Sequence, residues 1–295
     1  MLKRKTIGDV FFDSFNYVLL GLLSTVCLYP FLYIVFASFS QPDRLMSHYG
    51  VILKPLGFTL KGYEFVFRDP NIISGYLNTI LYVVAGTAFS VFCTSIAAYI
   101  LSRRNLKYTK YIMAMIIFTM YFGGGLIPYY MVINQLGLID NRLVMILPGA
   151  ISTWNMIVMR TSFREIPDSI EESARMDGAG DLTILFRIIL PLSQALIATM
   201  VLFYGVAIWN DWFSSMIFLR DNTKFPLQLV LRKILIVNDT SASTNAGRLG
   251  LLEADMYKRL IKYCAIVVSI IPVICVYPFL QKYFVKGVMI GSIKG

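Results

Sequence analysis

The side chains with the clearest potential for chemistry lie in a charged stretch between two apolar runs. Its carboxylates belong to Asp168, Glu171, Glu172, Asp177 and Asp181. Acids near the start of a helix suit the positive end of its dipole, and Glu171 can pair with Arg175 at i, i+4. One interpretation of such a stretch is an amphipathic helix that rests at the lipid interface. The number of acids weighs against it, because an anionic leaflet repels them.

The sequence lacks the residues of a familiar catalytic centre. His48 is the single histidine, and no GxxxxGK[ST] loop is present to hold a nucleotide phosphate. The four cysteines lie inside apolar runs without the CxxC spacing of a zinc site, at Cys27, Cys93, Cys264 and Cys275. We therefore expect no enzyme activity, no metal site and no cofactor in this chain. Any ATP that drives the protein must be bound by another chain.

The charged stretch is predicted to fold as two short helices with a turn between them. Pro167 suits the first position of a helix, and Gly178 and Gly180 then break it. Asp181 can cap the second helix. The apolar stripe of that helix would consist of Leu182, Leu185, Phe186 and Ile189, before Pro191 opens the next apolar run.

The composition indicates a protein that faces lipid. Hydrophobic residues make up 57% of the 295 positions and charged residues 15%, against about 45–50% and 25% in ordinary soluble domains. The formal net charge is +10, but the basic residues form short clusters between apolar runs rather than one face. Nucleic-acid binding is therefore not expected.

We predict an all-α membrane protein with a single domain over residues 1–295. Uncharged runs of about 20 residues are long enough to cross a bilayer, and an open strand edge is not tolerated in lipid. A short basic connection at 102–110 favours both termini in the cytoplasm. That orientation puts a loop at 166–190 inside and a long polar loop at 220–262 outside. The six expected spans are 14–40, 74–102, 111–133, 143–160, 190–212 and 263–284.

Several polar and aromatic residues in the spans are candidates to line a substrate path. Trp209, Asn210 and Asp211 come late in the fifth span, where a tryptophan is also common as an interfacial residue and a carboxylate is often merely solvated. The alternative is a ligand site, in which the indole packs a ring and the amide binds hydroxyls. Further candidates are Tyr204, Tyr121, Asn78, Thr79 and Tyr82. The glycines at 123–125 with Pro128 indicate either a helix end or a kink.

The charged stretch also carries a specific resemblance. The order E-[ES]-A-x-x-D-G-A followed by I-x-L-P resembles the "EAA" loop of binding-protein-dependent ABC importer permeases, with Glu172, Ser173 and Ala174 at the signature positions. Ser173 replaces the usual alanine. The resemblance extends over nearly the whole chain and is nearest to the carbohydrate-uptake branch, the type of the maltose transporter's second permease subunit. The segments 122–128 and 277–284 resemble the subgroup that imports oligosaccharides or polysaccharide fragments, alginate included.

The resemblance implies a role and a set of partners. The loop would be a coupling helix that docks on an ATPase, through Glu171, Glu172, Ser173, Ala174, Asp177, Gly178, Ala179 and Pro191. Two ATPase subunits would bind the ATP and magnesium, and a second permease subunit would complete a heterodimer in the bacterial cell (inner) membrane. An external solute-binding protein would deliver the saccharide, helped by the 220–262 loop, and the tail 287–295 would reach between the ATPases. The competing hypothesis is a secondary transporter or channel driven by an ion gradient, which would need paired intramembrane carboxylates or broken repeats.

Overall fold

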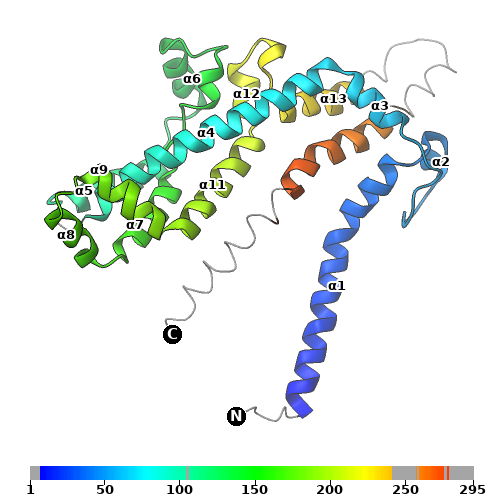
Figure 1. Ribbon diagram of the computed structural model, residues 1–295. Coiled ribbons are helices and arrows are strands. Elements are labelled where there is room, and N and C mark those ends of the chain that lie inside the picture. The colour runs from blue at the N-terminus through cyan, green and yellow to red at the C-terminus, as the bar shows by residue number, and fades with distance from the viewer. Residues whose placement is uncertain (1–6, 104–105, 241–256, 258, 276–277, 279–295) are drawn as a thin grey trace. The chain divides into compact units, whose positions relative to one another are not determined.

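The computed structural model describes residues 7–103, 106–240, 257, 259–275 and 278 (Figure 1). Within these residues the regular structure is helical, apart from an isolated bridge between Ser40 and Phe58. The chain divides into two compact units, one of residues 1–69 with 233–271 and one of residues 70–232 with 272–295. The predicted role of the tail 287–295 lies outside the described residues.

The first unit contains α1 (Ile7–Ser38), α2 (Pro42–Ser47), α3 (Lys61–Arg68) and the helical residues 259–275. α1 exposes nearly all of its apolar side chains, as a helix surrounded by lipid does. Its end is held by a hydrogen bond between Ser38 Oγ and Tyr63 OH of 2.7 Å. Cys264 is buried and its thiol donates to the carbonyl of Ser38, so it is a packing thiol.

The second unit is built on α4 (Pro70–Ser102), a continuous helix of 33 residues. α7 (Thr153–Arg164) and α11 (Gln194–Trp209) pack along it. Small residues of α4 such as Gly86, Ser90 and Ala98 are buried in these contacts, and small side chains let helices approach closely in a membrane. A buried hydrogen bond of 2.7 Å joins Thr94 Oγ1 to Tyr204 OH and ties α4 to α11.

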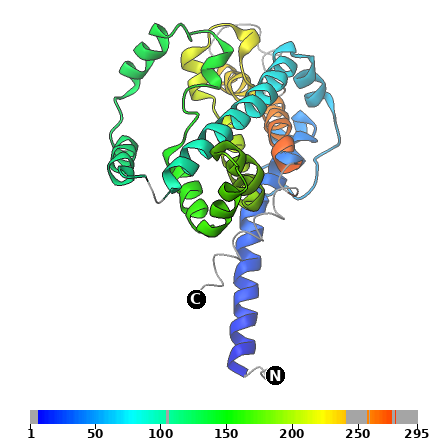
Figure 2. The same cartoon turned by 60° about the vertical axis from the view of Figure 1, so that its left-hand side comes forward.

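The third apolar run forms two helices rather than one. α5 (Thr109–Tyr121) and α6 (Leu126–Gln135) meet at an angle of 111°, and Figure 2 shows them to the left of α4. Gly125, with a φ of 81°, precedes the first residue of α6. Glycine adopts this left-handed conformation at little cost, so the glycine run ends one helix and redirects the chain into the next.

Other predicted runs also differ from the helices observed. The run 143–160 is not one helix, because η1 (Arg142–Met145) is followed by an irregular segment with Pro148 and Gly149 before α7 begins. The run 190–212 bends by 89° between Leu192 and Gln194. By length and composition, residues 8–38 and α4 could each cross a membrane, and up to four spans result if each bent pair counts as one. The boundaries of six spans stay a prediction.

Candidate functional site

The predicted break at Gly178 is a complete helix cap. α8 (Asp168–Met176) begins one residue later than predicted, because Pro167 is its N-cap rather than its first helical residue. At its other end the Gly178 N–H donates to Arg175 O at 3.0 Å, and the Ala179 N–H donates to Ala174 O at 2.9 Å. These two bonds define a Schellman motif, in which one residue must be left-handed. Gly178 has that conformation, with a φ of 81°, so its turn follows from the backbone.

The prediction that Asp181 caps the second helix is wrong. The N-cap of α9 (Asp181–Ile184) is Gly180, which has no side chain to cap the helix. The Asp181 carboxylate instead pairs with Arg103 Nη2 at 3.1 Å and with Arg175. Glu171 likewise pairs with Arg103. The predicted pair of Glu171 with Arg175 is thus replaced by pairs of Glu171 with Arg103 and of Arg175 with Asp181, both of which join α8 to other elements.

The predicted apolar stripe is wrong for two of its four members. Leu185 and Ile189 are buried, but Leu182 is 64% and Phe186 41% exposed, and Ile184 is fully buried instead. Leu182 and Ile184 belong to α9 and precede η2 (Leu185–Ile189), a π-helical turn. The helix face that packs on the core therefore already differs from the predicted stripe before this turn begins. α10 (Leu190–Leu192) follows and contains Pro191.

Arg103 is a functional candidate that the sequence pattern did not single out. It follows the last residue of α4, and its side chain is only 22% exposed where it meets the 19% exposed Glu171. Its guanidinium also lies 4.2 Å from the centre of the Tyr99 ring, a favourable cation–π geometry. Hydrogen bonds from Arg103 and then Arg175 hold the pKa of Asp181 below its ordinary value. In the sequence, the basic connection at 102–110 that contains Arg103 indicated only how the chain is oriented in the membrane.

The other predicted residues of the loop divide into two faces. Glu172, Ser173, Asp177 and Pro191 are exposed and are free to meet a partner protein. Ala174 and Ala179 are partly buried against the core formed by α4, α7 and η2. Their small size lets α8 lie close to that core. A cavity of about 650 Å³ lies beside this contact, lined among others by Arg103, Glu171 and Asp181.

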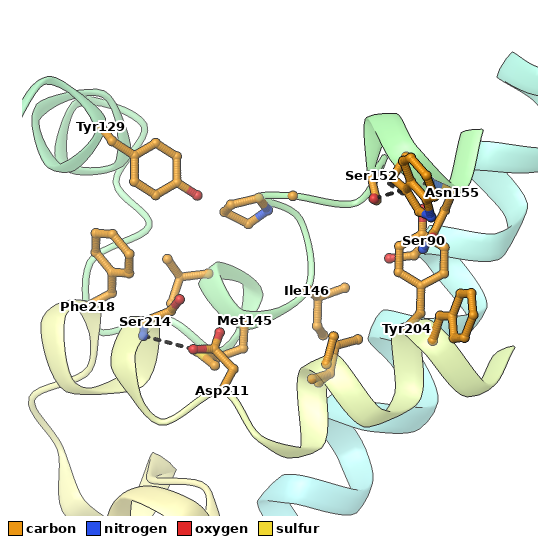
Figure 3. Close-up of a pocket in the computed structure, with 17 residues that line it drawn as sticks. Ser90, Tyr129, Met145, Ile146, Ser152, Asn155, Tyr204, Asp211, Ser214 and Phe218 are labelled. Atoms are coloured by element: carbon orange, nitrogen blue, oxygen red, sulfur yellow. Dashed lines mark hydrogen bonds between the residues drawn. The ribbon is translucent and has the colours of Figure 1, made fainter. Parts of the chain in front are cut away.

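A second cavity, of about 690 Å³, lies between α4, α7, α11 and the irregular segment after η1. Figure 3 shows Ser90, Tyr129, Asn155, Tyr204 and Asp211 around it. Two of the predicted path residues, Tyr204 and Asp211, therefore line a real cavity. Ser90, Tyr129, Trp154 and Asn155 also line it and were not predicted, because a single sequence does not reveal which helix face points inward.

The polar groups in this second cavity are ordered by hydrogen bonds. Tyr204 OH accepts from the Ser152 N–H at 3.0 Å in addition to its bond with Thr94. Asp211 Oδ1 accepts from the Ser214 N–H at 3.0 Å, ahead of α12 (Phe213–Phe218). These bonds fix the positions of the Tyr204 ring and the Asp211 carboxylate at the cavity wall.

Three other predicted path residues form hydrogen bonds with the backbone of residues 223–227 instead. Asn78 Nδ2 donates to Thr223 O at 2.7 Å and to Phe225 O at 3.1 Å, and Tyr82 OH donates to Lys224 O at 2.8 Å. Thr79 Oγ1 accepts from the Leu227 N–H at 2.8 Å. These bonds fasten η3 (Asn222–Lys224) and the start of α13 (Leu227–Thr240) to α4.

The remaining predicted path residues lie outside the cavity lining. Trp209 is 9% exposed and packs 6.4 Å from the ring of Tyr76. Asn210 is exposed, and its amide donates to Val206 O of its own helix. Tyr121 is 75% exposed at the end of α5. A direct role of these three in binding substrate stays a prediction.

A charged junction fastens the segment around Asp140 to the segment before η3. Asp140 Oδ1 accepts from the backbone N–H groups of Arg220 and Asp221, and Lys224 Nζ pairs with Oδ2 at 3.0 Å. These bonds lower the pKa of Asp140 to about 2. Asp140 also has a φ of 55°, a conformation that aspartate tolerates better than most residues.

The chain matches known proteins over nearly its whole length. Residues 90–290 match a family described as "Binding-protein-dependent transport system inner membrane component". The chain belongs to this family. Its fold class, an all-α importer permease, and the resemblance read from the charged stretch are thereby confirmed. The family is a membrane component rather than an enzyme, and the hypothesis of a carrier driven by an ion gradient is set aside.

Individual proteins and a solved structure are also similar to this chain. Protein LplC of Bacillus subtilis (strain 168) is 40% identical over 284 residues, covering 96% of this chain and 95% of that protein. The polygalacturonan/rhamnogalacturonan transport system permease protein YtcP of the same organism is also 40% identical over 284 residues, covering 96% and 98%. A solved bacterial ABC transporter involved in the import of the acidic polysaccharide alginate matches with a TM-score of 0.85 and 36% identity, covering 95% of this chain and 99% of that chain.

Proposed function

We propose that this permease forms part of the path by which an oligosaccharide or polysaccharide fragment enters a bacterial cell. A second permease subunit would complete the path as a heterodimer, two ATPase subunits would bind ATP and magnesium, and an external binding protein would deliver the sugar. Both termini of this chain would lie in the cytoplasm. The observation that carries the proposal is the second cavity, which joins aromatic rings to ordered polar groups.

The chemistry of the second cavity suits a saccharide. Its volume of about 690 Å³ falls within the range of about 300–1,000 Å³ that is usual for ligand sites. The rings of Tyr129 and Trp154 can pack against the C–H face of a sugar. Asn155, Ser90 and Asp211 can exchange hydrogen bonds with its hydroxyl groups. The relatives that transport polygalacturonan and alginate favour a saccharide as well.

The charge of the second cavity limits what this chain contributes to selectivity. Among the described lining residues Asp211 is the one carboxylate, and neither Lys nor Arg occurs. A uronic acid would find no cation on this wall and would be repelled by Asp211. We therefore assign to this chain the recognition of sugar rings and hydroxyls. If the substrate is acidic, its carboxylates would be bound by the partner permease.

The loop of residues 166–190, called the coupling loop below, supports the proposed link to an ATPase. Glu172 and Asp177 lie on the exposed side of α8, while the opposite side rests on the core through Ala174 and Ala179. A rigidly mounted helix with an exposed acidic face can bind a basic surface and pass on its movement. ATP hydrolysis itself would take place in the partner.

The test is ATP hydrolysis by the reconstituted complex of both permeases, the ATPases and the cognate binding protein. Oligogalacturonate, alginate fragments, arabino-oligosaccharides and galacto-oligosaccharides are supplied in turn. At least one should stimulate hydrolysis and be taken up into vesicles. The proposal fails if the binding protein binds a saccharide but no saccharide stimulates hydrolysis or enters the vesicles.

A matched pair of variants tests the second cavity directly. Tyr129 and its neighbour Tyr130 both pack against the Phe218 ring, with centres 5.7 Å and 6.0 Å away, but only Tyr129 is among the residues that line the cavity. Tyr129→Ala should raise the saccharide concentration needed for half-maximal uptake, whereas Tyr130→Ala should leave it near the wild-type value. Equal effects of the two changes would show that the ring acts through packing alone.

A further inference from the structure

We propose that Arg103 passes the movement of the coupling loop to α4, and that α4 carries it to the second cavity and to the segment 219–227. This inference rests on the proposed function, because it takes α8 as the helix that the ATPase moves. Arg103 is thus a positioning residue, which acts through the elements it joins rather than on the substrate.

The inner end of this route is a set of charged contacts. Arg103 pairs with Glu171 of α8 and with Asp181 of α9, and it packs on Tyr99 of α4. Arg103 and Glu171 are each about one-fifth exposed, so water screens their attraction less than it screens a surface pair. One guanidinium therefore holds both helices of the coupling loop against the end of α4.

The direct chain connection from the loop to α11 is less suited to transmit a push. It passes through the π-helical η2, Pro191 and the bend of 89° between Leu192 and Gln194. Each of these features interrupts the regular hydrogen bonds that make a helix stiff. α4, in contrast, runs without a break from Pro70 to Ser102.

The outer end of α4 is fastened as firmly as the inner end. Asn78 and Tyr82 donate to backbone carbonyls of residues 223–225, and Thr79 accepts from Leu227. From Asn78 to Ser102 the helix rises through 24 residue intervals, about 36 Å at about 1.5 Å each. This is enough to cross a hydrocarbon core of about 30 Å.

The middle of α4 touches the second cavity. Ser90 lines the cavity directly, and Thr94 bonds to Tyr204, another lining residue. A shift or rotation of α4 would therefore move a wall of the cavity and the segment 219–227 together. Rigid elements held at both ends transmit movement in this way.

The test compares Arg103→Gln with Lys107→Gln in the reconstituted complex. Both changes remove one positive charge from the connection after α4, and Lys107 is exposed. Arg103→Gln should lower the ratio of stimulated to basal ATP hydrolysis about tenfold, within the range usual for coupled sites. Lys107→Gln should keep the wild-type ratio. Arg103→Glu should also lose stimulation, and the double variant with Glu171→Arg should regain part of it, because the pair is then restored in reverse.

Hydrogen exchange supplies a readout that loss of packing alone would not change. In the wild-type complex the amides of 219–227 should exchange at different rates with and without ATP. In Arg103→Gln that nucleotide-dependent difference should disappear, while the rates without ATP stay near wild type.

The possible outcomes separate this inference from the proposed function. If no saccharide stimulates the wild-type complex, the proposed function fails. If the wild type responds and Arg103→Gln behaves as Lys107→Gln does, only the present inference is overturned. It is also overturned if Arg103→Gln no longer co-purifies with the ATPase, because Arg103 would then serve docking rather than transmission.

Discussion

Gly178 allows the most direct calculation from this structure. Its φ of 81° is left-handed, and a Cβ atom added there would meet nothing within 4 Å. Gly178→Ala therefore costs backbone strain without a clash, about 1–2 kcal/mol. This corresponds to a change of about 5- to 30-fold in the population of the capped turn. Gly178→Asn should cost less, since asparagine enters this region more readily.

Gly180 supplies the matched control for this substitution. A Cβ there would also meet nothing within 4 Å, but its φ of −79° suits any residue, so Gly180→Ala should leave the turn at Gly178 unstrained and cost only a less favourable N-cap of α9. Hydrogen exchange of residues 168–181 in the assembled complex measures the turn. Protection of the amide at position 179 should fall about 5- to 30-fold in Gly178→Ala, together with stimulated ATP hydrolysis. If Gly178→Ala matched Gly180→Ala in both assays, the left-handed turn would have no part in coupling.

Three further changes test other parts of the fold by unfolding in detergent. Asp140→Ala should destabilise more than Asp140→Asn. Because the Asp140 pKa is lowered to about 2, the stabilisation by the Asp140 carboxylate should be complete above a pH of about 4 and be lost as the pH falls through about 2. A stabilisation that stays constant down to a pH of about 1 would contradict the ion pair. Tyr204→Phe leaves the Ser152 N–H without its acceptor and should cost about 1–3 kcal/mol, so an unchanged midpoint would exclude that bond. Gly62→Ala places a Cβ 2.8 Å from Leu260 Cγ and should cost about 1–3 kcal/mol through overpacking, whereas an equal or higher stability would show that the contact is looser.

The features of the coupling loop that could be predicted from the sequence are set by residues next to one another in the chain. Gly178 acts on its own backbone, so its position in the sequence was sufficient to predict the turn. Pro167 marks the start of α8 to within one residue, as its N-cap rather than its first helical residue. The cap at Asp181 was predicted in the same way and failed, because Arg103 lies 78 residues earlier and takes the carboxylate. Local rules do not contain such a competitor.

Contacts between residues distant in sequence decide which side chains line the second cavity and which do not. Asn78 and Tyr82 were candidates to line the substrate path, but their partners lie 142–147 residues away, in the segment around η3. Once the backbone of that segment needs their hydrogen bonds, the two side chains are committed to it. Ser90 and Tyr129 were overlooked for the converse reason, since nothing in their own surroundings marks them as facing a cavity.

The charges of the coupling loop also bear on what can drive this permease. A carrier powered by protons needs a group that changes its charge near neutral pH. Among the described carboxyls outside the apolar runs that show a shift, Asp140, Asp181 and Asp221 all have a pKa below its ordinary value, because cations and backbone N–H groups bond to the charged form. They move away from neutral pH, so protonation of Asp181 does not supply the change that moves the loop near neutral pH. In the proposed function that change comes instead from a separate ATPase bound to the exposed face of α8.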